Sequence, residues 1–313
     1  MTTITYSIPP FLNPGDQVGV LAPASIVQYQ ELIPGLNVLK QEWGLKIVEG
    51  TTLKSQHHQF SASDQQRQQD LQAMLDNPEI KAIIAARGGY GCSRIIDQID
   101  FTTFLKQPKW IVGFSDLTAL HSHIQQLGVA SIHGPMVKSM MLDGAEEARG
   151  KLKSMLFGKA IHYRAPADPL NRTGHAQGIL AGGNLCLLSH LVGSSSDLDM
   201  SGKILFIEDV NEYLYNLDRM MLQLKRAGKL ANLAGLIVGQ FTDMKDNEDP
   251  AFGQNFSQII AGHVAPYHYP VAHQFPAGHV AHNLPLCMGA PAHLEVTASH
   301  TLLTYTPTAA LSL

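Results

Sequence analysis

The chain has 313 residues, of which 45% are hydrophobic and 15% are charged, and its formal net charge is −4. This composition is typical of a globular protein, and the length allows a substantial core and two domains. The weak negative charge argues against nucleic acid or an anionic membrane surface as a partner. The sequence contains no secretory signal pattern and no apolar stretch long enough for a membrane span, so we expect a cytoplasmic protein.

Cysteine and histidine are common metal ligands, but the sequence does not place them at the spacings of known metal-binding motifs. The three cysteines, Cys92, Cys186 and Cys287, are odd in number and widely spaced, and we interpret them as reduced thiols packed in the core. The 15 histidines include no HExxH motif and no Cys/His cluster with ligand spacing. We therefore expect neither a metal nor another cofactor.

Short apolar runs alternate with segments of helical periodicity in the first half of the chain. The expected strands span residues 17–21, 45–48, 80–86, 110–112 and 129–132. The expected helices cover residues 30–43, 63–75, 117–127 and 143–158, with a further helix through 94–96. This alternation predicts an α/β fold with a doubly wound, mostly parallel sheet, in an N-terminal domain of residues 1–158.

Residues 159–175 have weak periodicity and include Pro166 and Pro169, so we interpret them as a linker. A smaller α/β domain is expected over residues 176–313. Its pattern includes an apolar strand at 203–207, and two closing strands at its end are expected to form a hairpin. In doubly wound sheets, ligands bind beyond the carboxyl ends of the strands.

Ser115 lies at the turn between the expected strand 110–112 and the helix that follows it. Free backbone N–H groups and the positive end of the helix dipole are found at such a turn. One interpretation is a nucleophilic serine mounted as in a nucleophile elbow. The other is a helix N-cap, a role that serine fills well.

A serine nucleophile needs an imidazole to accept its proton and a carboxylate to orient that imidazole. Glu208 follows an apolar strand directly, and His279 lies in a loop rich in glycine and proline. Glu212 is an alternative carboxylate and His282 an alternative imidazole. The sequence alone does not show that any of these groups converge on Ser115.

The chain resembles the LD-carboxypeptidase family of serine peptidases, which also includes the microcin-immunity hydrolases. Each short motif is weak, but the ordered set is specific and covers nearly the whole chain. In chain order, the matching motifs are Gly15-Asp16-Gln17-Val18, Ala22-Pro23-Ala24-Ser25, Ala86-Arg87-Gly88-Gly89-Tyr90-Gly91, Gly113-Phe114-Ser115-Asp116, His133-Gly134-Pro135, Gly182-Gly183-Asn184-Leu185, Glu208-Asp209-Val210 and Gly278-His279, which Asn283 follows.

The resemblance implies a catalytic triad of Ser115, Glu208 and His279, located between the two domains. It also implies an oxyanion hole formed by the backbone N–H groups of Asp116 and of the glycine-rich turn, where we choose Gly89. Glycine directly before the histidine favours His279 over His282, and the family position favours Glu208 over Glu212.

The family's usual reaction is release of the terminal D-alanine from the murein tetrapeptide, during peptidoglycan recycling in the cytoplasm. Because this peptide carries several carboxylates, Arg87, Arg94 and Arg219 are candidate substrate-binding residues. The resemblance also implies a homodimer and no cofactor. The alternatives are a microcin-immunity hydrolase that uses the same triad on a peptide–nucleotide amide, and a non-catalytic sugar- or nucleotide-binding module. The absence of a GxGxxG or P-loop pattern argues against nucleotide binding by Gly88-Gly89.

Overall fold

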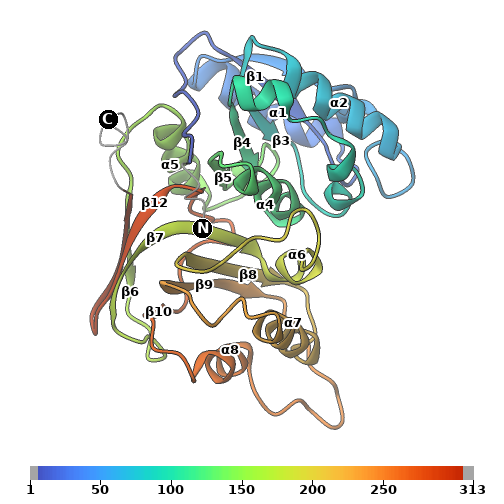
Figure 1. Cartoon of the computed structure of the whole chain (residues 1–313). Helices are drawn as coiled ribbons and strands as arrows, with labels where there is room; N and C mark the ends of the chain where they lie inside the picture. Colours follow the sequence, from blue (N-terminus) through green and yellow to red (C-terminus); the bar gives the residue numbers. More distant parts are fainter. Residues whose placement is uncertain (1–5, 306–313) are drawn as a thin grey trace. The chain divides into compact units, whose positions relative to one another are not determined.

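A computed structural model of the chain describes residues 6–305. Its contacts divide the chain into two compact units (Figure 1). The first unit comprises the chain up to Ala160 together with Ala281–Met288, and the second comprises Ile161–Val280 together with the chain from Gly289 onward. The chain therefore passes from one unit to the other three times.

The first unit is built on a six-stranded sheet whose order is β11-β5-β4-β3-β1-β2. The strands are β1 (Gln17–Leu21), β2 (Lys46–Glu49), β3 (Ile80–Ala85), β4 (Trp110–Gly113), β5 (Ser131–His133) and β11 (Leu286–Met288). All neighbours pair in parallel except β11, which is antiparallel to β5. The predicted α/β fold with a mostly parallel sheet is confirmed, and β1, β3, β4 and β5 lie side by side in Figure 1.

Helices pack their apolar residues onto this sheet. The helices of the first unit are α1 (Tyr29–Asn37), α2 (Asp64–Asp76), α3 (Thr102–Lys106), α4 (Thr118–Gln126) and α5 (Glu146–Leu156), with a π-helical turn η1 (Val38–Glu42) and 3₁₀ turns η2 (Thr51–Lys54), η3 (Cys92–Arg94), η4 (Ile96–Gln98), η5 (Ser115–Leu117) and η6 (Ser139–Met141). One core cluster joins side chains of α2, α3 and α4 to Ile83 of β3 and Ile111 of β4. Burial of this apolar surface is the main stabilising contribution to the layer.

One of three local predictions for the helices of this unit is confirmed, and two are wrong. The capping box that opens α2 is present, because Ser63 and Gln66 each accept from the other's backbone N–H. The helix expected through 94–96 is wrong, since this segment forms the short turns η3 and η4. The start of α5 was also wrong: Gly144 has a φ of +87°, and the helix begins at Glu146 without a side-chain cap.

The second unit is built on a seven-stranded sheet whose order is β10-β9-β8-β7-β12-β13-β6. Its strands are β6 (His162–Pro166), β7 (Gly174–Asn184), β8 (Ile204–Val210), β9 (Gly235–Thr242), β10 (Val271–Ala272), β12 (Pro291–Val296) and β13 (His300–Tyr305). The strands from β7 to β10 pair in parallel, whereas β12, β13 and β6 pair in antiparallel fashion. β12 and β13 form the hairpin that the sequence predicted.

The helices of the second unit are α6 (Leu185–His190), α7 (Leu214–Arg226) and α8 (Phe256–Val264). Their apolar faces pack with β8 and β9 into one core, to which Leu205, Leu217 and Ile260 belong, each fully buried. The segment 159–175, expected to be a linker, contains β6 at the edge of this sheet.

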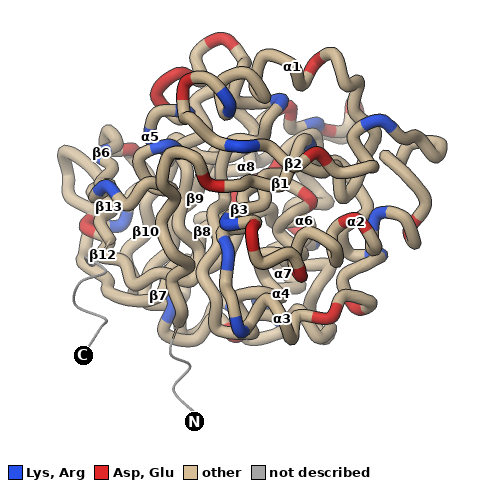
Figure 2. The backbone as a smooth tube through the Cα atoms, turned by 90° about the horizontal axis from the view of Figure 1, so that it is seen from above, with Lys and Arg blue, Asp and Glu red and all other residues tan. Residues whose placement is uncertain are grey.

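Acidic and basic residues are interspersed along the backbone, without a long block of either sign (Figure 2). No helix among residues 6–305 combines the length and the apolar character that crossing a membrane requires.

Candidate active site

Ser115 occupies a strained turn at the carboxyl end of β4. Its φ is +66°, a left-handed conformation that non-glycine residues rarely adopt. Phe114 before it is fully extended, and η5 and α4 follow directly. A Cβ at Gly113 would collide with Cδ2 of Leu117, so a side chain at the last strand position would force this buried leucine to move. Strain of this kind is characteristic of a nucleophile elbow and is not expected of a simple N-cap, whose backbone lies in the β region.

A buried histidine supports this turn from within the first unit. His121 on α4 places Nε2 2.8 Å from the carbonyl oxygen of Gly113 and Nδ1 2.8 Å from Oγ of Ser131. A carbonyl can only accept, so Nε2 carries the proton and Nδ1 accepts from the serine hydroxyl. Burial lowers the pKa of His121 to about 4. The ring is therefore neutral near pH 7 and connects α4 and β5 to the end of β4.

The glycine-rich turn after β3 lies against the serine turn. A Cβ added at Gly88 would lie 3.1 Å from Cβ of Ser115, so the two turns are in contact. The backbone is left-handed at Gly89, with φ +108°, and at Gly91, with φ +146°. Ser25 borders the same turn, because its Oγ accepts from the N–H of Tyr90 at 3.1 Å.

This arrangement lies where the order of the parallel strands reverses. In the sequence β2-β1-β3-β4-β5, the loops after β1 and β3 diverge, and such a switch point is the usual ligand position of a doubly wound sheet. The loop after β1 carries Ser25, the loop after β3 carries Gly88–Gly91, and the loop after β4 carries Ser115. These groups were each predicted as site residues or matching motifs, and the first unit brings them together.

In the second unit, Glu208 and His279 form a direct pair. Nδ1 of His279 lies 2.6 Å from Oε2 of Glu208, whose side chain is fully buried. Glu208 ends the apolar part of β8, and the loop with His279 is aligned along β9 by a bridge between Gln240 and Gly278. A Cβ at Gly278 would lie 3.0 Å from Cβ of Glu208. This close approach explains why glycine precedes the histidine.

The electrostatics of this pair suit an imidazole that accepts a proton. Burial acts to lower the pKa of His279, but the charge of Glu208 and the hydrogen bond to it outweigh burial and raise the pKa above its usual value. Because a carboxylate only accepts, Nδ1 carries a proton, and Nε2 is the unprotonated nitrogen of the neutral ring. The carboxylate thus selects the tautomer that general-base catalysis requires.

The alternative carboxylate and imidazole have other partners. Glu212 accepts a hydrogen bond from Nδ2 of Asn216, one helical turn further along α7. His282 belongs to the first unit, where its Nε2 lies 3.0 Å from Oε2 of Glu147. Within the second unit, the geometry therefore selects Glu208 as the partner of His279.

Asp209 is a buried carboxylate beside the pair whose role we did not predict. It accepts hydrogen bonds from Nδ2 of Asn184 at 2.8 Å and from the N–H of Cys186 at 2.9 Å. Burial raises the pKa of Asp209 to about 7, and the neighbouring charge of Glu208 adds to the rise. Asp209 thereby attaches the start of α6 to the end of β8. Its position within the motif Glu208-Asp209-Val210 was the available sequence signal.

The three candidate substrate-binding arginines differ in how they are engaged. Arg87 donates from Nη1 to the carbonyl oxygen of Ile26 at 2.7 Å. Arg94 forms a two-pronged ion pair with Asp64, at 2.9 Å from Nε and 2.6 Å from Nη2. The guanidinium of Arg219 lies over the ring of Tyr215 on α7. Arg94 would have to exchange its carboxylate partner to bind a substrate, which makes it the weakest candidate.

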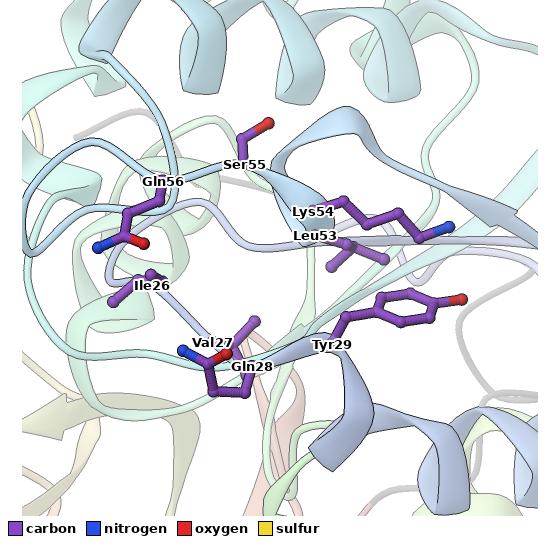
Figure 3. A pocket seen from close by; sticks show the side chains of 8 residues that line it. All are labelled: Ile26, Val27, Gln28, Tyr29, Leu53, Lys54, Ser55 and Gln56. Carbon is purple, nitrogen blue, oxygen red and sulfur yellow. The ribbon is translucent and has the colours of Figure 1, made fainter.

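A pocket of about 240 Å³ lies beyond the carboxyl ends of β1 and β2 (Figure 3). Two segments line it, residues 26–29 and residues 53–56. Its titratable lining groups are already paired: Nζ of Lys54 lies 3.0 Å from Oε2 of Glu49, and the Tyr29 hydroxyl donates to the same oxygen at 2.8 Å. The Ser55 hydroxyl in this lining donates to the carbonyl oxygen of Thr51 at 2.8 Å, and none of the eight lining residues is a histidine or a carboxylate that could act as its base.

Two models of known protein families match the chain. The model of the LD-carboxypeptidase N-terminal domain matches residues 18–134, and that of the LD-carboxypeptidase C-terminal domain matches residues 177–294. The chain belongs to the LD-carboxypeptidase family. As a member, it is a carboxypeptidase of the serine class.

Relatives of known name extend over nearly the whole chain. A probable murein peptide carboxypeptidase from Bacillus subtilis is 36% identical over 292 residues, which is 92% of this chain and 91% of that protein. The crystal structure of muramoyltetrapeptide carboxypeptidase from Oxalobacter formigenes is 28% identical, with a TM-score of 0.83, and covers 92% of this chain and 98% of that one. The microcin C7 self-immunity protein MccF, in its wild-type apo state, also has a TM-score of 0.83. It is 19% identical and covers 96% of this chain and 99% of that one, so it shares the fold.

The LD-carboxypeptidase family assignment confirms the predicted resemblance and the class of enzyme. The expected triad and oxyanion hole stay predictions. Among residues 6–305, no group of three or more His, Cys, Asp or Glu side chains is arranged to hold a metal ion.

Proposed function

We propose that the protein is an LD-carboxypeptidase that hydrolyses the amide bond to the terminal D-alanine of the murein tetrapeptide. The observation that carries the proposal is the buried Glu208–His279 pair, which prepares a proton acceptor, together with the strained serine turn at Ser115. The names of the relatives support the substrate class.

In the proposed reaction, Oγ of Ser115 attacks the carbonyl carbon while Nε2 of His279 accepts its proton. Glu208 holds the ring and stabilises the imidazolium that forms. The backbone N–H groups of Gly89 and Asp116 stabilise the tetrahedral oxyanion. His279 then protonates the leaving amine of D-alanine, and water hydrolyses the acyl-enzyme with His279 again as the base.

Recognition of the substrate carboxylates is assigned to Arg87 and Arg219 ahead of Arg94, because Arg94 already pairs with Asp64. The cytoplasmic location and the homodimer belong to the same proposal and stay predictions. Light scattering of the purified protein would test the dimer.

The direct test is to incubate the purified protein with the murein tetrapeptide and to measure released D-alanine, with Ser115→Ala as the matched variant. We expect release by the wild-type protein and a loss of roughly 10³-fold or more in the variant. Equal release by both proteins would overturn the triad. Hydrolysis of an aminoacyl-nucleotide amide, with no action on the tetrapeptide, would assign the microcin-immunity activity instead.

A further inference from the structure

One peptide unit of the glycine-rich turn, between Gly91 and Cys92, is held at both ends by buried charged side chains. Its carbonyl oxygen accepts a hydrogen bond from Nη1 of Arg67 at 2.9 Å. Its N–H donates to Oδ2 of Asp116 at 2.7 Å. Arg67 and Asp116 are both fully buried. A cation and an anion thus face each other across a single peptide group.

Arg67 is itself rigidly held. Nη1 also donates to the carbonyl oxygen of Pro23 at 2.6 Å, and Nε donates to that of Ala62 at 3.3 Å. Nη2 forms an ion pair with Asp64, and the guanidinium stacks over the ring of Phe60. A Cβ at Gly91 would lie 2.5 Å from Nη1, so glycine is needed for the guanidinium to approach the backbone.

Burying Arg67 and Asp116 costs free energy, which suggests that holding this peptide group has a function. A fully buried guanidinium and a buried carboxylate each lose hydration, and hydrogen bonds must replace it. Burial raises the pKa of Asp116, while its bonds to the Cys92 and Gly91 backbone and the charge of Arg67 act in the opposite direction. Glycine loses more conformational freedom on ordering than any other residue. The turn with Gly88, Gly89 and Gly91 would therefore be poorly ordered without such an anchor.

We propose that Arg67 and the carboxylate of Asp116 form a peptide clamp, and that both are positioning residues for the oxyanion hole. Asp116 follows the nucleophile and supplies one oxyanion donor through its own N–H. Its side chain holds the turn that carries the other donor, at Gly89. One residue thereby fixes the separation of the two donors before substrate arrives, and preorganised donors give the largest electrostatic stabilisation of an oxyanion. This inference rests on the proposed function.

A buried clamp could also serve only the stability of the fold. The test therefore needs a measurement that does not change when stability alone changes. Lys109 provides the matched control. It is another buried cation, 2% exposed, and its Nζ donates to the carbonyl oxygens of Met74 at 3.0 Å and Asn77 at 2.7 Å. It precedes β4, whereas Ser115 follows that strand, so it lies at the opposite edge of the sheet.

The experiment compares Asp116→Ala, Asp116→Asn, Arg67→Met and Lys109→Met. For each variant, kcat, KM, the thermal midpoint and the affinity for a peptide boronic acid are measured. Asp116→Ala and Arg67→Met should lower kcat about 10²-fold while KM changes little, and boronate affinity should fall in parallel. Asp116→Asn keeps an acceptor for the Cys92 N–H and should recover most of the loss. Lys109→Met should lower the thermal midpoint and leave kcat unchanged.

The clamp is overturned if Asp116→Ala keeps wild-type kcat and boronate affinity while Ser115→Ala is inactive. It is equally overturned if kcat follows the thermal midpoint through all four variants. Full activity of Ser115→Ala would instead remove the proposed function itself, so the two failures are distinct. Should Arg67→Met not fold, the two Asp116 variants decide the question, because they change only the anionic side of the clamp.

Discussion

Nδ1 of His279 lies 2.6 Å from a fully buried oxygen of Glu208, and the two residues are 71 positions apart in the chain. A proton acceptor with a defined tautomer is therefore present within the second unit, before any substrate binds. The pair gives the proposed mechanism its pH dependence.

Glu208→Gln should lower kcat/KM roughly 10²- to 10⁴-fold and move the acid limb of its pH profile to lower pH. His279 must be neutral to accept a proton, and the charge of Glu208 raises the pKa of His279, so removal of that charge lets the ring stay neutral at lower pH. The measurement is kcat/KM against pH. Glu212→Gln is the matched control, since Glu212 bonds to Asn216. An unmoved limb in Glu208→Gln would contradict the pairing.

Two replacements of Ser115 distinguish the loss of the hydroxyl group from the effect of backbone strain on stability. Both Ser115→Ala and Ser115→Gly remove the hydroxyl and should be inactive. With φ at +66°, alanine retains the strain and glycine relieves it. Ser115→Gly should therefore unfold at a higher urea concentration than Ser115→Ala, by roughly 1 kcal/mol in the free energy of unfolding. Equal stability of the two variants would show that the turn stores no such strain.

The stability of the fold should depend on pH through His121. Its pKa is about 4 in the folded protein, below the ordinary value of 6.5. The contribution of neutral His121 to the free energy of unfolding is fully present above about pH 6.5. It is lost as the pH falls toward 4, because His121 then binds a proton in the unfolded chain but not in the folded protein. The loss is on the order of 3 kcal/mol.

The check on His121 is urea unfolding at pH 7.5 and pH 5. The stability difference between wild type and His121→Gln should shrink at the lower pH, since glutamine does not titrate. His190→Gln, at an exposed position on α6, serves as the control for replacing a histidine by glutamine. A constant difference across this range would refute a buried neutral histidine.

Gly89→Ala should reduce kcat, whereas a glycine-to-alanine change that adds only backbone strain should not. The added Cβ would collide with Oγ of Ser25 and shift the turn that carries the proposed donor. Gly15→Ala is the matched control, because Gly15 has a similar φ of +95° and nothing within 4 Å of an added Cβ. Both variants should lose about 1 kcal/mol or more of stability. Only Gly89→Ala should lose activity, and normal turnover in it would exclude Gly89 from the oxyanion hole.

Much of the fold follows from the sequence because its strong patterns are local. The apolar runs at β1, β3, β4 and β8 each begin after a polar residue, and the capping box at Ser63 marks the start of α2. These signals depend on neighbouring residues only. Ser115, Glu208 and His279 were candidates because each stands at a strand end or in a glycine-rich loop, and the family resemblance favoured Glu208 over Glu212 and His279 over His282.

The elements that sequence reasoning missed depend on distant partners. β6 lies in a segment of weak periodicity and is defined by its pairing with β13. β11 has three residues and exists because β5 offers an unpaired edge. Arg67 was overlooked although it lies four residues before Leu71 and shares the buried face of α2. A charged residue at an apolar-face position was the signal, but the carbonyl groups that satisfy it come from three separate loops.

The eight residues Ala281–Met288 lie in the first unit, although the chain on both sides of them belongs to the second. A gene fragment ending at Ala160 would therefore encode a sheet without its last strand and would leave β5 as an open edge that recruits other chains. Expression of that fragment alone should yield aggregates under conditions in which the intact chain does not aggregate. The better division for a split reporter or for complementation lies within an exposed loop of one unit, such as residues 246–251.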